Sequence, residues 1–391
     1  MDKINKNLFN NTELAFSNKS DFELKKAYYL FRFLDFPLLT KFGNFFLIFV
    51  LNLRLPVKGI IRKTIFHHFC GGENIEDCAP VFKSLSKHNI LAMPEYSIEA
   101  ESTFEGFENY KNDSINLIEY IGNLSLPFLA IKCTGLISIN ALEKISSGEL
   151  NSMSDEYKDF KNRMRELCNS AKNNNVRILV DAEESWIQQA INDVTLELME
   201  IYNKKHVVIF LTYQCYKIDT LKKISKDFQY AYKNDFNLGV KLVRGAYMEK
   251  ELSRSLNYEY KCPIHISKNN TDNEFNNSVE FCIKNLNSLS LWIGSHNENS
   301  FYNIINLMNK KKIKKNDDRV WFSQLYGMSD NISFTLASLG YNVLKLIPFG
   351  PIEKTIPYLI RRANENSSVK GQSNRQYTLI KHEINRRKDL N

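Results

Sequence analysis

Charged and polar side chains recur at one kind of position in this sequence, directly after short apolar runs rich in β-branched residues. Such runs predict buried strands, and the carboxyl ends of parallel strands are where binding and catalytic side chains gather. Taken singly, each has a structural explanation, such as a helix cap or a lysine whose stem lies along apolar surface. Together they predict a ligand site, because unpaired charges are costly to bury. The candidates are Glu95, Lys132, Asp181, Gln214, Lys241, Arg244, Tyr247, His296 and Gln324.

A second group of charged residues lies near the carboxyl end, in the segment IPYLIRRANENSSV. Arg361 and Glu365 are four residues apart, which places them on one face of a helix, and Arg362 projects beside them. A surface ion pair of little energetic value would explain this spacing. Two adjacent guanidinium groups after an apolar turn are also suited to bidentate capture of a carboxylate or a phosphate. We favour this second interpretation.

The elements that would position these residues show a regular alternation. Eight apolar runs begin near residues 89, 127, 176, 207, 238, 289, 320 and 342, and segments with helical apolar spacing separate them. This pattern predicts an α/β fold of the (β/α)8 TIM type, for which about 250 residues suffice. An open doubly wound sheet is the competing architecture. We expect an N-terminal helical segment over residues 1–87, packed on a catalytic barrel over residues 88–391.

The composition is that of a folded globular protein. The 391 residues are 43% hydrophobic and 25% charged, which argues against a disordered chain or one that crosses a membrane many times. The net charge of +8 suits an anionic ligand, an anionic membrane surface or nucleic acid. Seven cysteines without paired spacing indicate reduced thiols.

The first residues, MDKINKNLFNNTELAF, show neither a secretory signal nor an Arg- and Ser-rich transit peptide. We therefore expect a cytoplasmic protein. The most apolar window, residues 42–53, is shorter than the ~20 residues of a spanning helix. It is expected to form a buried helix or an interfacial one, and the latter would allow peripheral contact with the inner face of a membrane.

Two stretches closely resemble proline dehydrogenase, the FAD-dependent family that oxidises L-proline to 1-pyrroline-5-carboxylate. They are VKLVRGAYMEKE at 240–251 and YLIRRANENSS at 358–368. Shorter matching pieces are IKCTG at 131–135, LVDAEES at 179–185, YQCY at 213–216, SHNE at 295–298 and QLYGM at 324–328. The resemblance covers residues 88 to 370 and points to the monofunctional, mitochondrial-like branch. It implies hydride transfer from proline C5 to flavin N5, with electrons passed on to a quinone-type acceptor in proline catabolism.

The resemblance also implies a role for each matching residue. Asp181 and Lys241 would be catalytic, with Asp181 beneath the substrate and Lys241 near the isoalloxazine ring. Arg361 and Arg362 would bind the proline carboxylate. The other substrate-binding residues would be Lys132, Tyr247, Leu346, Tyr358 and Glu365. The residues that line FAD would be Ala182, Gln214, Lys241, Arg244, Gly245, Ala246, Ser295 and His296, with Arg244 suited to the pyrophosphate.

One substrate position departs from the family pattern. The family often has an aromatic residue, usually Tyr, two places before the conserved proline of the eighth strand, whereas this chain has Leu346 before Pro348. In the family that tyrosine packs on the substrate ring, so its replacement implies a roomier and more apolar pocket. We expect selectivity between proline and hydroxyproline to change. Met248 stands where some members place Trp against the flavin.

Two other functions fit part of the pattern. A barrel Schiff-base lyase or aldolase would use Lys132 as nucleophile and the paired arginines to bind an anionic substrate. An anion-binding module would use the net charge and the NKKKIKK run at 309–315 to bind nucleic acid or anionic lipid. Such charge runs are usually solvated faces, so we expect no nucleic-acid partner. Flavin chemistry also requires no metal.

Overall fold

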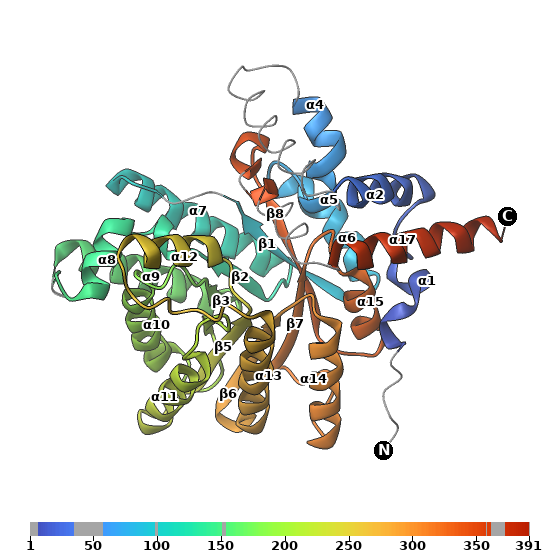
Figure 1. The fold of residues 1–391 in the computed structure, drawn as a ribbon. Helices are drawn as coiled ribbons and strands as arrows, with labels where there is room; N and C mark the ends of the chain where they lie inside the picture. The colour runs from blue at the N-terminus through green and yellow to red at the C-terminus, as the bar shows by residue number, and fades with distance from the viewer. Residues whose placement is uncertain are drawn as a thin grey trace. The chain divides into compact units, whose positions relative to one another are not determined.

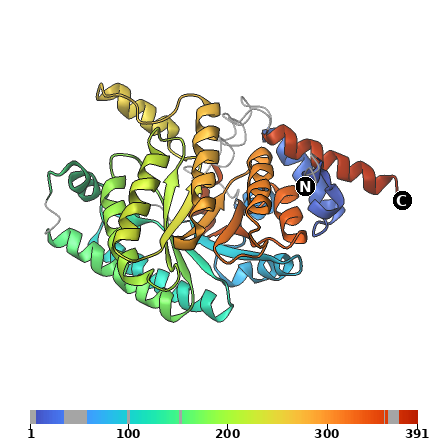
Figure 2. The same cartoon turned by 90° about the horizontal axis from the view of Figure 1, so that it is seen from below.

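The fold is built from parallel strands that alternate with helices along the chain (Figures 1 and 2). The computed structural model describes residues 7–34, 58–97, 101–150, 154–356, 358–360 and 372–390. Eight strands form one sheet in the order β1-β8-β7-β6-β5-β4-β3-β2, and every pair with a described register is parallel. This sequential order is that of a (β/α)8 barrel, so the predicted fold is confirmed. It excludes the doubly wound sheet, in which the strand order reverses.

Each predicted apolar run forms a strand. Asn89, Ser125, Asn175 and Asp235 precede four of these strands and have φ values between 53° and 57°. This left-handed conformation, which Asn and Asp tolerate better than most residues, turns the chain from a helix into the next strand. The strands are β1 (Ile90–Tyr96), β2 (Phe128–Ile131), β3 (Arg177–Val180), β4 (Ile209–Gln214), β5 (Leu238–Val243), β6 (Leu289–Gly294), β7 (Val320–Leu325) and β8 (Val343–Phe349).

Helices connect the strands, and four of them begin at a side-chain cap. Thr103, Ser138, Ser154 and Asn297 each accept a hydrogen bond from a backbone N–H of the first turn of α7, α8, α9 and α14, respectively. Helix α6 (Ala79–Ser86) precedes β1. The connecting helices are α7 (Phe104–Asn123), α8 (Ile139–Ser147), α9 (Asp155–Asn173), α10 (Gln188–Tyr202), α11 (Thr220–Lys233), α12 (Met248–Asn257), α13 (Lys268–Lys284), α14 (Glu298–Lys310) and α15 (Asp330–Ser338).

The chain divides into two compact units. One consists of Met1–Ile98 with Ser323–Asn391, and the other of Glu99–Phe322. The first unit holds β1, β8 and the terminal helices, whereas the second holds β2 to β6 and helices α7 to α14. The division into residues 1–87 and 88–391 stays a prediction.

The terminal helices of the first unit form an apolar cluster. They are α1 (Thr12–Ala15), α2 (Asp21–Leu34) and α17 (Gln372–Lys388). Two short helices, α4 (Lys58–Ile61) and α5 (His67–Phe69), come after α2 in the chain. Leu24 and Phe31 of α2 share this buried cluster with Leu379 and Ile380 of α17. The helices expected before the barrel are therefore present at α1 and α2. The apolar window at 42–53 lies outside the described residues.

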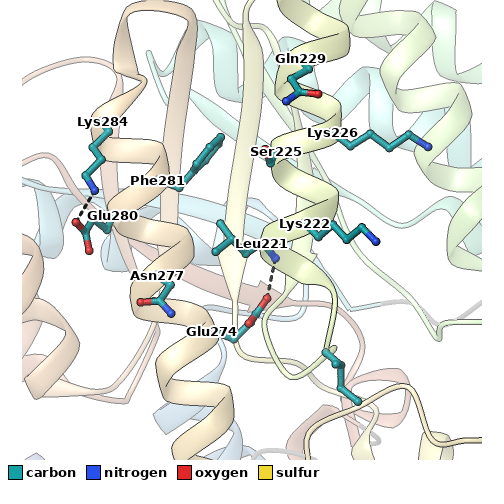
Figure 3. Close-up of a pocket in the computed structure, with 11 residues that line it drawn as sticks. Leu221, Lys222, Ser225, Lys226, Gln229, Glu274, Asn277, Glu280, Phe281 and Lys284 are labelled. Atoms are coloured by element: carbon teal, nitrogen blue, oxygen red, sulfur yellow. Dashed lines mark hydrogen bonds and ion pairs between the residues drawn. The ribbon is translucent and has the colours of Figure 1, made fainter.

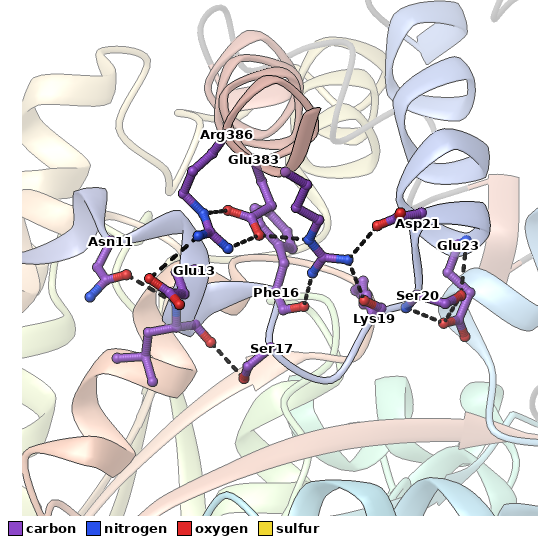
Figure 4. Close-up of polar contacts among 12 residues, drawn as sticks. Asn11, Glu13, Phe16, Ser17, Lys19, Ser20, Asp21, Glu23, Glu383 and Arg386 are labelled. Carbon is purple, nitrogen blue, oxygen red and sulfur yellow. Dashed lines mark hydrogen bonds and ion pairs between the residues drawn. The ribbon is translucent and has the colours of Figure 1, made fainter. Parts of the chain in front are cut away.

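A buried carboxylate connects these terminal segments (Figure 4). Glu383 of α17 is fully buried and accepts hydrogen bonds from Arg386 at 2.9 Å and from Arg387 at 2.8 Å. Arg387 also donates to the Phe16 carbonyl at 3.0 Å and to Asp21 at 2.8 Å. The carboxylate therefore holds two arginines that both reach the N-terminal segment, because Arg386 also lies 3.5 Å from the carboxylate of Glu13.

An open groove of about 920 Å³ lies in the second unit between α11 and α13 (Figure 3). Its walls include Leu221 and Phe281, together with Lys222 and Lys284. None of the strand-end candidates lines it, so it is not the site predicted from the sequence. Within the ranges that the structure describes, no helix combines the length and apolar character needed to cross a membrane.

Candidate active site

The second unit brings the two predicted catalytic residues into contact. Asp181 directly follows β3, and the ammonium of Lys241 in β5 donates a hydrogen bond to its Oδ1 at 2.5 Å. The side chains of Lys241 and Asp181 are only 7% and 18% exposed. Removing either partner would leave a largely buried charge without its counter-charge. The catalytic role of the pair stays a prediction, but its geometry provides a fixed positive charge at the ends of the strands.

Trp292 of β6 lies beside this pair. It is in register with Lys241, whose Nζ is 5.0 Å from the centre of the indole ring. Trp292 is buried, and its Nε1–H finds no acceptor among the described residues. A buried donor without an acceptor costs free energy, so this position suits an acceptor atom supplied by a ligand.

Sequence reasoning missed Glu183, two residues beyond Asp181. Its buried carboxylate accepts hydrogen bonds from the Tyr247 hydroxyl at 2.5 Å and from the Thr134 hydroxyl at 3.3 Å. Burial raises the pKa of Glu183 to about 7, although the hydrogen bond from Tyr247 works in the opposite direction. Burial also raises the pKa of Tyr247, which keeps this phenol protonated. The signal in the sequence was the second carboxylate of DAEES, two places after the first.

Gln214, at the end of β4, links the loops that follow β3 and β5. Its Nε2 donates to the Glu183 carbonyl at 2.8 Å, and its Oε1 accepts from the Ala246 N–H at 3.1 Å. Gly245 has a φ of 133°, and a Cβ added there would lie 2.4 Å from the Tyr216 ring. Only glycine fits this backbone position, which leaves the adjacent Ala246 N–H directed at Gln214.

Arg244 is held in a polar cradle in the second unit. Its guanidinium donates to Asp272 at 2.7 Å, to Ser295 at 2.6 Å and to Ser300 at 2.9 Å, and it lies 4.4 Å from the centre of the Phe275 ring. These bonds use three of the five N–H donors of an arginine and leave one on each terminal nitrogen. An oriented guanidinium with donors to spare is suited to an anionic group.

Three further candidates of this unit follow strands and are half-buried. Lys132 follows β2, and its backbone N–H donates to the Tyr110 hydroxyl at 3.1 Å. Ala182 follows β3, and His296 follows Ser295 beyond the end of β6. Their roles stay predictions. Among the residues that the structure describes, no group of three or more His, Cys, Asp or Glu side chains is arranged to hold a metal ion.

Leu346 lies in β8 of the first unit and is 8% exposed. The ammonium of its neighbour Lys345 is 2.8 Å from the carboxylate of Asp330 in α15. Successive side chains of a strand point to opposite faces of the sheet, so Leu346 points away from the face that α15 covers. This is the orientation expected of a residue that faces the barrel interior.

The remaining described candidates of the first unit lie among residues that contribute to the core or to internal hydrogen bonds. Tyr358 is buried within the same apolar cluster as Phe31. The side-chain oxygen of Gln324 accepts a hydrogen bond from the Ser333 hydroxyl at 2.6 Å, and Glu95 is half-buried in β1. The proposed carboxylate-binding residues lie outside the described residues and keep the status of predictions. They are Arg361 and Arg362, and Glu365, which would restrain them, also lies outside the described residues.

Residues 78–375 match the family model for proline dehydrogenase. The chain belongs to the proline dehydrogenase family. Proline dehydrogenase 1 of Dictyostelium discoideum, named as mitochondrial, is 32% identical over 384 residues, which cover 86% of this chain and 67% of that protein. Hydroxyproline dehydrogenase of Xenopus laevis is 30% identical over 416 residues, covering 95% of this chain and 89% of that protein. The predicted family and enzyme class are confirmed, and neither the lyase nor the anion-binding module gains support.

Proline dehydrogenase domains also share the fold. Proline utilization A from Bdellovibrio bacteriovorus, inactivated by N-propargylglycine, aligns with a TM-score of 0.72 and 21% identity, covering 80% of this chain and 34% of that one. At this identity the likeness supports the (β/α)8 fold alone. The chain spans 56% of the length of a relative from Caenorhabditis elegans, proline dehydrogenase 1.

The cytoplasmic location expected from the sequence is wrong. Proline dehydrogenases of D. discoideum, C. elegans and Arabidopsis thaliana that match this chain are named mitochondrial. The expectation rested on the residues with which the sequence begins, and these carry no evidence about the compartment of the folded enzyme.

Proposed function

We propose that this chain binds FAD and oxidises L-proline to 1-pyrroline-5-carboxylate in proline catabolism. The observation that carries the proposal is the connected set of polar side chains at the strand ends of the second unit. Asp181 holds Lys241 at 2.5 Å, and Gln214 links the loops after β3 and β5. These positions are the ones that the family resemblance assigns to cofactor and substrate.

Three features of the second unit fit a flavin dinucleotide. Arg244 has N–H donors left for a pyrophosphate oxygen, beyond those that bind its protein partners. Trp292 offers a buried indole N–H for which the described residues provide no acceptor. Gly245 forms a tight turn that has no space for a side chain at this residue. The residues proposed to line FAD are Ala182, Gln214, Lys241, Arg244, Gly245, Ala246, Ser295 and His296.

When bound, FAD would supply the two-electron acceptor, at its N5, for the hydride of proline C5. The protein binds and orients the substrate. Arg361 and Arg362 are proposed to hold the proline carboxylate through paired, charge-assisted hydrogen bonds, with Glu365 as their restraint. Asp181 keeps the Lys241 ammonium in place, so its charge needs no reorganisation during the reaction. The side chains proposed to line the substrate pocket are Lys132, Tyr247, Leu346 and Tyr358.

We further propose a quinone-type electron acceptor and peripheral contact with a membrane. The resemblance to the mitochondrial-like branch supports the acceptor, and the net charge of +8 favours an anionic surface. A soluble quinone analogue should therefore reoxidise the proline-reduced enzyme.

The residue at position 346 supports hydroxyproline as a second substrate. Leu346 replaces the aromatic residue that the family usually has here, and the relative from X. laevis is named hydroxyproline dehydrogenase. We propose that trans-4-hydroxy-L-proline is accepted beside L-proline, since an apolar pocket discriminates weakly against an added hydroxyl.

Purified protein tests the proposed function. FAD should bind in equimolar amount, and L-proline but not D-proline should then support reduction of a soluble quinone analogue. A folded chain that takes up no FAD, or one that reduces the analogue equally with both enantiomers, would contradict the proposal.

A further inference from the structure

We propose that Glu183 is a positioning residue whose carboxylate holds the Tyr247 phenol in place, and that loss of its negative charge weakens substrate binding. The inference rests on the proposed function, because the family resemblance places Tyr247 in the wall of the substrate pocket. Glu183 itself is assigned no contact with the substrate. Its effect passes through the 2.5 Å hydrogen bond from Tyr247.

Every polar group of Glu183 is engaged. Its backbone N–H donates to the side-chain oxygen of Gln188 at 2.7 Å, and its carbonyl accepts from Gln214 at 2.8 Å. Its carboxylate oxygens accept from Tyr247 and from Thr134. The carboxylate cannot turn away without the loss of these bonds, so the position of the Tyr247 hydroxyl is fixed from the loop after β3.

The charge of Glu183 lacks the ion-pair partner that its neighbours have. Asp181 is paired with Lys241, and Glu184 with Lys250. Between Glu183 and the rest of the described chain there is no salt bridge, so hydrogen bonds and the more distant charge of Lys132 are what stabilise the ionised carboxylate. The titratable groups that face it come from the loops after β2, β3 and β5, and they are Lys132, Cys133, Asp181, Glu184 and Tyr247.

The protonation of Glu183 should therefore change how firmly Tyr247 is held. Burial raises the pKa of Glu183 to about 7, so it changes charge near neutral pH. Above this pH the ionised carboxylate accepts a charge-assisted hydrogen bond, whereas below it the neutral acid is a weaker acceptor. A carboxylate ligand should then bind about tenfold more weakly at low pH, which is the difference expected between a charged and a neutral acceptor.

The binding test uses the FAD-loaded enzyme and tetrahydro-2-furoate, the ring-oxygen analogue of proline, because this probe has no amine to titrate. Changes in the flavin absorbance report its Kd at about pH 6 and about pH 8. For the wild-type enzyme the Kd should be about tenfold higher at the lower pH. Glu183→Gln should bind weakly and equally at both values, and Tyr247→Phe should also lose the pH dependence. Glu184→Gln, which removes the adjacent carboxylate, should keep it.

A second measurement needs no cofactor. Infrared titration of the FAD-free protein through neutral pH should reveal the carbonyl stretch of a protonated, buried carboxylic acid that Glu183→Gln lacks. Retention of the full pH dependence in Glu183→Gln, or absence of that band, would overturn the inference. Failure of the wild-type chain to take up FAD would instead count against the proposed function, because the infrared titration examines the Glu183 carboxyl by itself.

Discussion

The Lys241 ammonium and the Asp181 carboxylate meet at 2.5 Å across two strands that are not neighbours, since β4 lies between β3 and β5 in the sheet. Lys241 also lies 5.0 Å from the centre of the Trp292 ring on the next strand, β6. The lysine is therefore fixed from two sides. Its ammonium therefore places a positive charge where the flavin is proposed to bind.

Lys241→Met should lower the affinity for FAD at least tenfold and reduce the free energy of unfolding by about 3 kcal/mol, because Asp181 would lose its buried counter-ion. Fluorescence titration with FAD and urea unfolding measure the two effects. Lys223→Met is the matched control, since it breaks a 2.5 Å pair with the buried Asp227 on the outer helix α11. An equal loss of FAD affinity in both variants would mean that Lys241 has no specific part in cofactor binding.

The strands could be predicted from the sequence, but their cross-strand partners could not. The strands of a parallel barrel are covered on both faces and therefore form near-continuous apolar runs, such as VVIFL at 207–211. Contacts across the barrel depend on the register of the strands and on the depth of each side chain in the barrel. The spacing of residues along the sequence determines neither. Asp181 and Lys241 are 60 residues apart in the chain, and Glu183 and Tyr247 are 64 apart. The sequence identifies Asp181 and Lys241 as candidates but not the contact between them, and it does not identify Glu183.

Glu383→Gln should reduce the free energy of unfolding by about 3 kcal/mol at neutral pH. Burial alone would raise the pKa of Glu383, but hydrogen bonds from Arg386 and Arg387 lower it from 4.5 to about 2. A folded-state pKa below the unfolded value stabilises the protein above the unfolded value, and this contribution is lost as the pH falls through the folded value.

The difference between wild type and Glu383→Gln should therefore shrink as the pH falls from 4.5 toward about 2, which urea unfolding at several pH values measures. Glu280→Gln removes an exposed partner of Lys284 and should change stability little at any pH. A difference that stays constant over the acidic range would show that the Glu383 carboxylate is not held by its arginines.

Leu346→Tyr should move selectivity toward L-proline. A phenol ring placed on this face of β8 would fill space beside the substrate ring and meet a C4 hydroxyl. The ratio of kcat/KM for trans-4-hydroxy-L-proline to that for L-proline should fall, by about tenfold and at most about 10²-fold. FAD content serves as the control for folding. An unchanged ratio, or one that rises, would place Leu346 away from the substrate.

Arg361→Met and Arg362→Met should each weaken proline binding far more than FAD binding. Loss of one guanidinium from a desolvated pair costs about 2 to 5 kcal/mol, since it leaves the carboxylate partly unpaired. Proline titration of the flavin spectrum and FAD content separate the two effects. Arg319→Met, which removes a guanidinium bound to Asp317, should leave proline affinity unchanged. Parallel losses of FAD and proline would show that the paired arginines do not bind the substrate carboxylate.

The most direct test of the account is the absorbance spectrum of the FAD-loaded protein under anaerobic conditions, before and after addition of L-proline. The proposed function predicts that L-proline bleaches the flavin band and that D-proline does not, with the colour restored by a quinone analogue. A correctly folded, FAD-loaded protein whose spectrum L-proline leaves unchanged would contradict it.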